Sequence, residues 1–334
     1  MTRRAKLFLL LAPTALLAAA AAGILLGPEG LPIRFDAESF RPTISAPGIF
    51  EMRVLRVLLA AGVGAALAVA GVTFQAILRN PLADPYVLGA SSGGGLGAAV
   101  FIILAAPAAA GLLGDWGVPL AAFAGSALAV ALVYRLALVA GRIPRMTLLL
   151  AGVVIGYMLA GLLLFIVSRW GADRLHDVMW WLLGSLGAGN PGLVTAVWWC
   201  AAIGIGLTWL LAHDLDLLAL GEEQAAHLGL APERAKKVFF MLGSLLTGAA
   251  VAASGLIGFV GLVVPHLVRM VIGPGHRRLV PCAAFAGATF LVLVELASRS
   301  MLPGREVPVG VVTAFVGGPF FLWLLRNQRK VFWG

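Results

Sequence analysis

Residues Val238 to Val268 read VFFMLGSLLTGAAVAASGLIGFVGLVVPHLV, and this stretch decides the fold. It contains no aspartate, glutamate, lysine or arginine, and the first charge after it is Arg269. One straight helix over residues 238–272 would be about 52 Å long, far more than the hydrocarbon core of a bilayer, which is roughly 30 Å thick. The basic residues on either side favour the same membrane face. The chain must therefore turn back, and we predict the turn near Ser254-Gly255 or Gly258.

The composition extends this interpretation to the whole chain. Of its residues 61% are hydrophobic and 12% are charged, which excludes an ordinary soluble domain. Apolar runs of about 20 residues recur along the sequence, so we predict an all-α polytopic membrane protein with about ten transmembrane helices. One transmembrane domain, residues 1–334, leaves no room for a separate soluble domain. The predicted spans are 7–27, 54–78, 87–113, 117–139, 147–168, 191–212, 238–256, 258–272, 280–298 and 308–325.

The distribution of basic residues predicts the orientation. With both termini in the cytoplasm, 16 of the 24 lysines and arginines fall on the cytoplasmic side and 8 on the outer side. This bias explains the formal charge of +9 better than a nucleic-acid partner does. Arg3, Arg4 and Lys6 before an apolar run also fit a secretory signal peptide. Because the run continues to Leu26, we favour an uncleaved first span.

The one long polar stretch runs from His213 to Lys237 and falls on the predicted cytoplasmic side. Gly221 suits a helix N-cap, and the glutamates after it suit the positive end of a helix. Gly229 then predicts a helix stop, and Pro232 predicts the first turn of the next helix. This stretch therefore predicts a compact helical knob on the membrane surface, with a solvated connector as the simpler alternative.

The sequence does not predict catalysis. No lysine follows a glycine, so the phosphate-binding pattern G-x-x-x-x-G-K-[ST] is absent. The spans are almost free of charge, which disfavours an autonomous ion-coupled carrier and indicates that another subunit supplies energy. For His266 a local hydrogen bond is the better interpretation than membrane-embedded hydrolysis. His213, Asp214 and Asp216 fit a solvated surface cluster better than a metal site.

Three further segments predict the structure of the connections between the spans. The loop from Arg79 to Pro85 contains two prolines, and Asn80 and Asp84 can cap its exposed backbone. Residues 142–147 (RIPRMT) contain Pro144 and predict a similar tight turn in the next cytoplasmic connection. On the outer side, residues 173–183 predict an amphipathic interfacial helix whose tryptophans belong to an aromatic belt.

Motifs along nearly the whole chain resemble the FecCD-type (BtuC-like) permeases of bacterial ATP-binding-cassette importers for ferric siderophores, haem and cobalamin. Gln75, the Leu228-Gly229 pair and several longer runs carry the resemblance. These runs are 53–56 (RVLR), 64–71 (GAALAVAG), 80–85 (NPLADP), 88–93 (LGASSG), 181–185 (WLLGS), 220–223 (LGEE), 258–266 (GFVGLVVPH), 308–313 (PVGVVT) and 317–319 (GGP).

The resemblance implies a transport subunit of the bacterial inner (plasma) membrane and no enzyme. Its expected partners are a second copy of the chain, two ATPase subunits that use ATP and magnesium, and a periplasmic or lipid-anchored solute-binding protein. The chain itself would hold no cofactor and no metal. A ferric siderophore is the expected substrate, with cobalamin or haem as alternatives. The alternative from another functional class is an autonomous secondary carrier, which would transport without an ATPase subunit.

The resemblance also assigns three groups of residues. ATPase coupling would use two short cytoplasmic helices at approximately 219–236. Arg145 and Met146 depart from the small or polar residues that relatives often have at the second gate. The three groups are the coupling residues Gly221, Glu222, Glu223, Ala225, Ala226, Leu228 and Gly229; the cytoplasmic gate residues Asn80, Pro81, Leu82, Arg145, Met146 and Thr147; and the binding-protein docking residues Arg53, Arg56 and Arg299.

Overall fold

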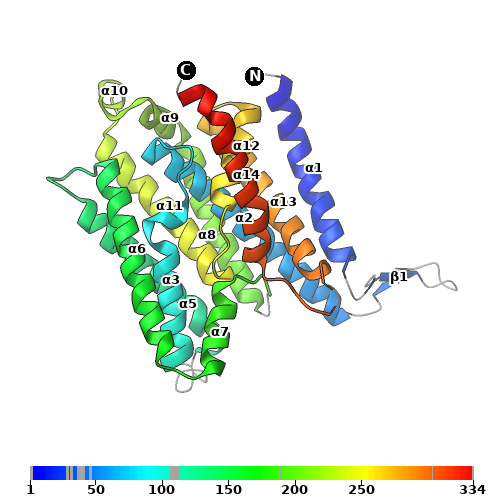
Figure 1. Cartoon of the computed structure of the whole chain (residues 1–334). Helices are drawn as coiled ribbons and strands as arrows, with labels where there is room; N and C mark the ends of the chain where they lie inside the picture. Colours follow the sequence, from blue (N-terminus) through cyan, green and yellow to red (C-terminus); the bar gives the residue numbers. More distant parts are fainter. Residues whose placement is uncertain are drawn as a thin grey trace.

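The structure is a computed structural model that describes residues 3–27, 30, 33–35, 42–44, 47–105, 113–187, 190–302 and 304–332. Helices form nearly all of it (Figure 1). The long or apolar helices are α1 (Arg3–Leu25), α2 (Pro47–Leu78), α3 (Ala90–Val100), α5 (Gly117–Ala137), α6 (Arg145–Ser168), α8 (Pro191–Leu210), α11 (Pro232–Ser254), α12 (Val260–Ile272), α13 (His276–Ser300) and α14 (Val309–Phe332).

Shorter elements connect these helices. They are the antiparallel strands β1 (Ile33–Phe35) and β2 (Pro42–Ile44), the short helices η1 (Pro85–Leu88), η2 (Phe101–Ala105) and η3 (Gly114–Trp116), and the helices α7 (Ala172–Leu182), α9 (Ala212–Leu220) and α10 (Glu222–His227). Helix α7 lies where a helix was predicted over residues 173–183, whereas the two-stranded ribbon was not predicted.

The predicted helical membrane fold is confirmed, and a helix lies at each of the ten predicted spans. Six helices within the described residues are long and apolar enough to cross a membrane, and four others are apolar but shorter. The third predicted span, 87–113, differs most within residues 87–105, and its residues 106–112 lie outside the described residues. Asp84 accepts a hydrogen bond from the Tyr86 N–H and caps η1, and Gly89 with φ of 83° separates η1 from α3. The helix is therefore broken at its start.

The chain turns back between α11 and α12, as predicted. Helix α11 ends at Ser254, and Gly255 follows with φ of 68°. Phe259, also with φ of 68°, precedes α12. With 13 residues, α12 is about 20 Å long, so it is too short to cross a bilayer core of roughly 30 Å alone.

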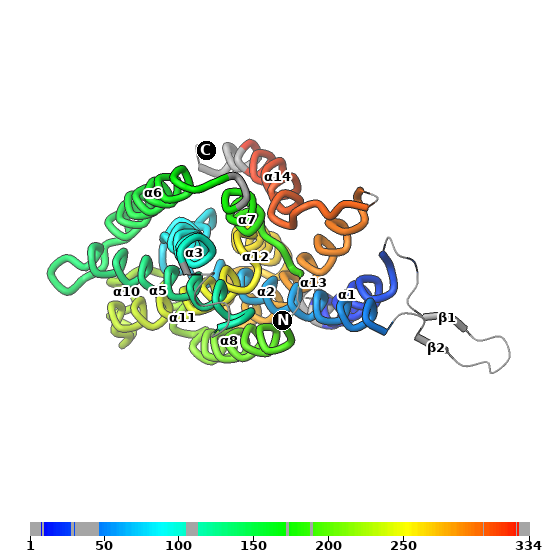
Figure 2. The backbone as a smooth tube through the Cα atoms, turned by 90° about the horizontal axis from the view of Figure 1, so that it is seen from below, coloured from blue at the N-terminus to red at the C-terminus, as the bar shows by residue number. Residues whose placement is uncertain are grey.

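Helix α2 lies at the centre of the bundle (Figure 2). Of its most apolar window, 94% is buried inside the protein. A Cβ atom added at Gly64 would lie 2.2 Å from the carbonyl oxygen of Gly287 in α13. One added at Gly71 would meet the backbone of Gly261 in α12. These glycines allow backbone contact between helices, which is how helices associate in lipid.

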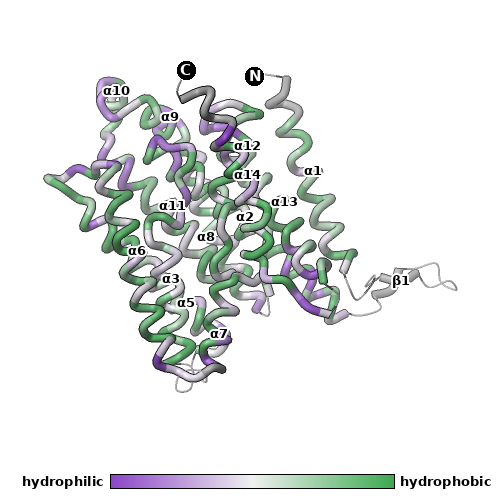
Figure 3. Tube along the Cα trace, in the orientation of Figure 1, coloured by the Kyte–Doolittle hydropathy of each residue, from purple (hydrophilic) through white to green (hydrophobic). Residues whose placement is uncertain are grey.

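Hydrophobic residues predominate along the middle of the helices, and hydrophilic residues gather towards the two ends (Figure 3). Helices α9 and α10 lie at the same end as the start of α1 and the end of α14, and α7 lies at the opposite end (Figure 1). We call these the α10 end and the α7 end. The bundle therefore presents two polar surfaces separated by an apolar band.

The Gly64 contact gives a test of this packing. We expect Gly64→Ala to destabilise the protein by about 1–3 kcal/mol, because the new methyl group overlaps the Gly287 backbone. Thermal unfolding in detergent measures the effect. Gly161→Ala in α6 is the matched control, since nothing lies within 4 Å of a Cβ atom there. Equal melting temperatures for the two variants would contradict the packing role of Gly64.

Candidate functional site

The polar knob at the α10 end has the predicted form. Gly221, with φ of 130°, separates α9 from α10 and is the N-cap of α10. Gly229, with φ of 90°, lies after the helix, and Pro232 begins α11. Ala225 is fully buried, whereas Leu228 is 60% exposed. The knob therefore has an inner face against the bundle and an outer face available to a partner. Of the remaining predicted coupling residues, Glu223 and Ala226 are exposed and Glu222 is half-buried.

A buried lysine connects the inner side of the knob to the rest of the α10 end. The Lys236 side chain is only 3% exposed, and its Nζ lies 3.1 Å from Glu222 Oε2. Nζ also pairs with Glu233 and donates to the Ile143 carbonyl oxygen at 3.0 Å. The Ile143 N–H in turn donates to Glu233 Oε2 at 3.0 Å. We call Lys236, Glu222, Glu233 and Ile143 the Lys236 network. It fastens α10 and α11 to the loop before α6.

The second predicted gate region contacts the start of α10, and so does Arg79, which precedes the first gate region. Arg145, the first residue of α6, pairs with Glu222 at 3.2 Å. A Cβ atom added at Gly221 would lie 3.2 Å from the Arg79 guanidinium, so that side chain lies against the N-cap. Arg79 itself has φ of 48° at the end of α2. The unusual Arg145 thus joins the second gate region to the coupling knob.

The first gate region is a compact turn. The Asn80 side chain accepts from the Leu82 N–H at 2.9 Å, and the Asn80 N–H donates to the Gln75 carbonyl. Asn80, Pro81 and Leu82 are all partly exposed. Farther along, a Cβ atom at Gly152 of α6 would lie 2.5 Å from the Val87 carbonyl oxygen. Helix α6 therefore packs directly on η1, the short helix that follows the first gate region in sequence.

Arg145, Met146 and Thr147 begin α6 but differ in surroundings. Met146 is 72% exposed, whereas Thr147 is partly buried. Because Arg145 is held by Glu222, Met146 is the residue of the three that projects most freely from the α10 end.

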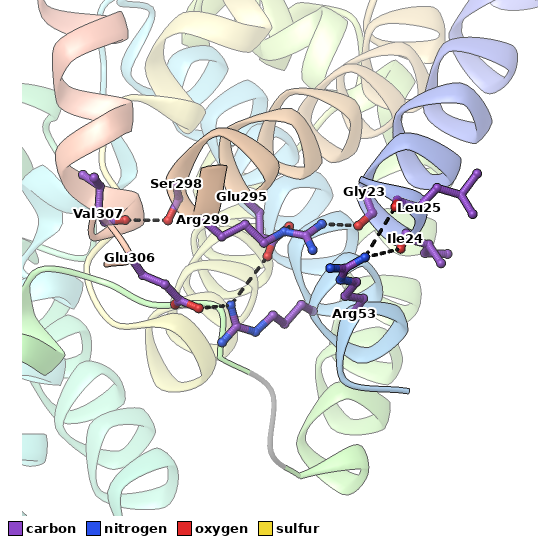
Figure 4. A network of polar contacts seen from close by, with 10 residues as sticks. Gly23, Ile24, Leu25, Arg53, Glu295, Ser298, Arg299, Glu306 and Val307 are labelled. Carbon is purple, nitrogen blue, oxygen red and sulfur yellow. Dashed lines mark hydrogen bonds and ion pairs between the residues drawn. The ribbon is translucent and has the colours of Figure 1, made fainter. Parts of the chain in front are cut away.

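Two of the predicted docking arginines, Arg53 and Arg299, lie beside the end of α1 (Figure 4), which is at the α7 end of the bundle (Figure 1). Arg56 joins them through Glu295. Arg53 and Arg299 are buried, at 3% and 5% exposure. Arg53 donates to the Ile24, Leu25 and Gly30 carbonyls, and Arg299 donates to the Gly23 carbonyl. These contacts satisfy carbonyls at the end of α1, which have no partner within the helix. The sequence analysis did not predict this internal role.

Arg56 is more accessible than the other two arginines. Its guanidinium lies 2.7 Å from Glu306 Oε1, and the Glu306 side chain is 49% exposed. Buried Glu295 lies 3.2 Å from Arg299 and 4.0 Å from Arg56. A cavity of about 360 Å³ opens beside the cluster, lined by Met52, Arg53, Arg56, Arg299, Gly304, Arg305 and Glu306.

The sequence analysis missed one contact at the α10 end. Asp216 Oδ1 in α9 accepts from the His276 N–H at 2.9 Å and lies 2.7 Å from His276 Nδ1. Burial alone would raise the pKa of Asp216, but the hydrogen bonds from His276 and the charges of His276 and His213 hold that pKa below its usual range. This pair fastens α9 to the first turn of α13.

The described residues contain no group of three or more histidine, cysteine, aspartate or glutamate side chains that could hold a metal ion. Nδ1 of His266 is buried without a hydrogen-bond partner in that part of the chain, so the predicted local hydrogen bond is not seen at this nitrogen.

The chain is similar to several known proteins. The model of the FecCD transport family matches residues 14–327. The cobalamin import system permease protein BtuC of Halobacterium salinarum is 40% identical, over 83% of this chain and 73% of its own length. The hemin transport system permease protein HmuU of Yersinia pestis is 41% identical, over 84% and 83%. The Fe(3+) dicitrate transport system permease protein FecD of Escherichia coli is 39% identical, over 84% and 86%.

A solved structure described as an inward-facing, metal-chelate type ABC transporter superposes with a TM-score of 0.83 and 28% identity, covering 96% of this chain and 99% of the other. PsaBC from Streptococcus pneumoniae superposes with a TM-score of 0.57 at 16% identity, over 82% and 90%, which is a similarity of fold alone.

The Asp216–His276 pair predicts a pH-dependent contribution to stability. We expect Asp216→Asn to lower the free energy of unfolding by about 1 kcal/mol at pH 7, because a charge-assisted contact is lost at a partly exposed site. Since the pKa of Asp216 is lowered in the folded protein, the contribution is present above the usual carboxyl range and is lost as pH falls through the folded value.

Thermal unfolding of the wild type and the variant at a series of pH values measures this effect. The difference between them should be largest near neutrality and shrink below about pH 4. Asp214→Asn, two residues away in the same helix, is the matched control. A constant difference at all pH values would contradict the assignment.

Proposed function

Because the chain belongs to the FecCD transport family, we propose that two copies of it form the path of an ATP-binding-cassette importer that carries a ferric siderophore. The chain is the permease subunit and not an enzyme, and ATP hydrolysis belongs to a separate subunit. The observation that carries the proposed mechanism is the Lys236 network, which joins α10 to the gate region at the start of α6.

We place the α10 end in the cytoplasm of a bacterial cell and the chain in its inner membrane. This end carries exposed Arg79, Arg142, Arg234 and Lys237, and it holds the start of α1 and the end of α14 (Figure 1). A surplus of basic residues on short loops favours the cytoplasmic side. The ATPase subunits would therefore bind at the α10 end, and a solute-binding protein would bind at the α7 end.

The outer face of α10 suits insertion into a groove of an ATPase subunit. Ala226 is small and exposed, and Leu228 beside it offers exposed apolar surface. Glu223 and His227 on the same short helix are also exposed and add polar contacts at the edge. A small apolar centre with a polar rim is the usual anatomy of a protein interface.

The inner face of α10 would transmit movement of the ATPase to the path. The Glu222 carboxylate contacts both Arg145 and Lys236, so a shift of α10 pulls on the start of α6 and on the loop before it. Helix α6 packs through Gly152 on η1, which follows the first gate region in sequence, so that a shift of α6 would also reach this region. Movement of the knob would thus open or close the cytoplasmic end of the path, giving alternating access.

At the α7 end, Arg56 is the best-placed arginine for docking an acidic surface of the solute-binding protein. It already pairs with the half-exposed Glu306 carboxylate, so its guanidinium is oriented towards a position that a partner's carboxylate can take. Arg53 and Arg299 would act from beneath by holding α1 and Glu295 in place.

The metal-chelate description of the structural neighbour and the ferric dicitrate relative support a ferric siderophore as substrate. Cobalamin or haem is the alternative, as the names of two relatives indicate. A chelate could first meet the cavity of about 430 Å³ that Trp180, Trp181 and His176 line beside Gly255. Ligand titration of the cognate binding protein decides among these substrates. Uptake into liposomes by the purified chain alone, without ATP, would favour a secondary carrier instead.

The outer face of α10 gives the first test. We expect Ala226→Trp to abolish co-purification of the ATPase subunit, because the indole cannot enter a groove shaped for a small side chain. Ala226→Ser is the matched control and should retain binding. Full assembly of the Ala226→Trp variant would exclude α10 as the docking element.

The Lys236 network gives the second test. We expect Lys236→Met to leave the ATPase bound and active but to lower transport about tenfold, because α10 and the loop before α6 no longer move together. Transport per ATP hydrolysed, measured in liposomes with the binding protein present, reports this loss. Arg234→Met, an exposed neighbour, should behave as the wild type. An unchanged transport ratio in Lys236→Met would overturn the coupling mechanism.

A further inference from the structure

A groove between α5 and α11 has the shape and charge of a lipid site. Its volume is about 360 Å³. Near the α10 end it is bordered by Arg135 and Lys237, and the rest of its wall is mainly apolar or aromatic. The lining residues are Phe123, Ala127, Val130, Ala131, Tyr134, Arg135, Lys237, Phe240, Met241, Ser244, Leu245 and Gly248.

The length of the groove matches one leaflet of a bilayer. From Arg135 to Phe123 along α5 is about 18 Å, and from Lys237 to Gly248 along α11 is about 16 Å. Half of a hydrocarbon core is about 15 Å. Phe123 lies against Gly248 at the far end, where an added Cβ atom would be 3.5 Å from the ring. The groove therefore extends from the membrane interface to about the middle of the bilayer.

The two cations at its mouth have no partner among the described residues. Arg135 in the last turn of α5 and Lys237 near the start of α11 are both exposed. Neither side chain forms a hydrogen bond or ion pair within that part of the chain. This contrasts with Lys236, the preceding residue, whose ammonium is fully engaged with carboxylates. The mouth thus carries a concentrated positive charge beside an apolar channel.

The aromatic wall of the groove also suits an acyl chain. The Tyr134 and Phe240 rings lie 5.5 Å apart across α5 and α11. In the end-on view, α5 and α11 lie on the side of the bundle away from α14 (Figure 2). None of the residues that line the groove belongs to α10.

We propose that this groove binds one anionic phospholipid of the cytoplasmic leaflet, with its phosphate between Arg135 and Lys237 and an acyl chain along Ala131 and Ala127. Basic pockets between membrane helices bind anionic headgroups in this way. The lipid would fasten α5 to α11, the helix that follows the coupling knob. The inference uses the proposed orientation but does not depend on the transported substrate.

Native mass spectrometry of the purified full chain tests the site. The protein is titrated with phosphatidylglycerol and with phosphatidylcholine of the same acyl chains. We expect the wild type to prefer phosphatidylglycerol. The double variant Arg135→Gln/Lys237→Gln should lose about 25-fold in affinity for phosphatidylglycerol, about fivefold for each charge removed. The loss for phosphatidylcholine should be smaller, because its choline already balances the phosphate, so the preference should disappear.

The matched control removes two exposed charges at the same end but outside the groove. Arg142→Gln/Arg234→Gln should keep the preference for phosphatidylglycerol. Equal losses in both double variants, or none in the groove variant, would overturn the site. Ala131→Phe should weaken both lipids by filling the channel, and thermal unfolding without added lipid should confirm that it folds.

Two further arms identify the source of the phosphate and separate this inference from the proposed transport function. Glycerol 1-phosphate should not displace the lipid, and displacement at millimolar concentration would show recognition of the phosphate alone and contradict a lipid site. Lys236→Met should retain the lipid preference even where coupling is lost. Lipid binding and transport can therefore fail independently.

Discussion

The contact of α2 with its neighbours at backbone distance is the constraint on which both ends of the protein depend. Gly64 and Gly71 remove the side chains that would hold α13 and α12 away. Lipid gives no hydrophobic force between helices, so this close packing fixes the centre of the bundle. Helix α2 has 32 residues and is about 48 Å long. It carries Arg53 and Arg56 at one end and leads into Arg79 at the other, so it links the arginine cluster and the coupling knob through one rigid element.

The charges at the α10 end join segments that are far apart in the sequence. Burying the Lys236 ammonium is costly unless several acceptors surround it, and two carboxylates and a carbonyl do so. Loss of one acceptor leaves a buried charge incompletely paired. Relative displacement of α10 and the loop before α6 is therefore unfavourable, and the proposed coupling rests on this cost. The hydrogen bond from the His276 N–H to Asp216 also attaches α9, the helix before α10, to α13.

Local sequence signals predicted the segments of the fold well. The charge-free run from Val238 predicted the turn at Gly255, and glycine and proline predicted the limits of α10 and α11. The contacts of the site could not be predicted in the same way, because they join residues such as Ile143 and Lys236 that are 93 positions apart. The burial of Arg53 and Arg299 was missed because both donate to backbone carbonyls at or just after the end of α1, and such acceptors have no sequence signature. The resemblance supplied the residue roles, and these stay predictions.

The central claim is that α10 and the loop before α6 move together when ATP binds. Electron paramagnetic resonance tests it most directly. One experiment places spin labels at positions 227 and 142 of one copy, and a second places one label at position 146 of both copies. The two cysteines of the chain, Cys200 and Cys282, are first replaced so that only these positions are labelled. The account predicts that ATP changes the Met146 distance between copies while the distance from position 227 to 142 within a copy stays constant. An intramolecular distance that changes as much as the distance between copies would contradict it.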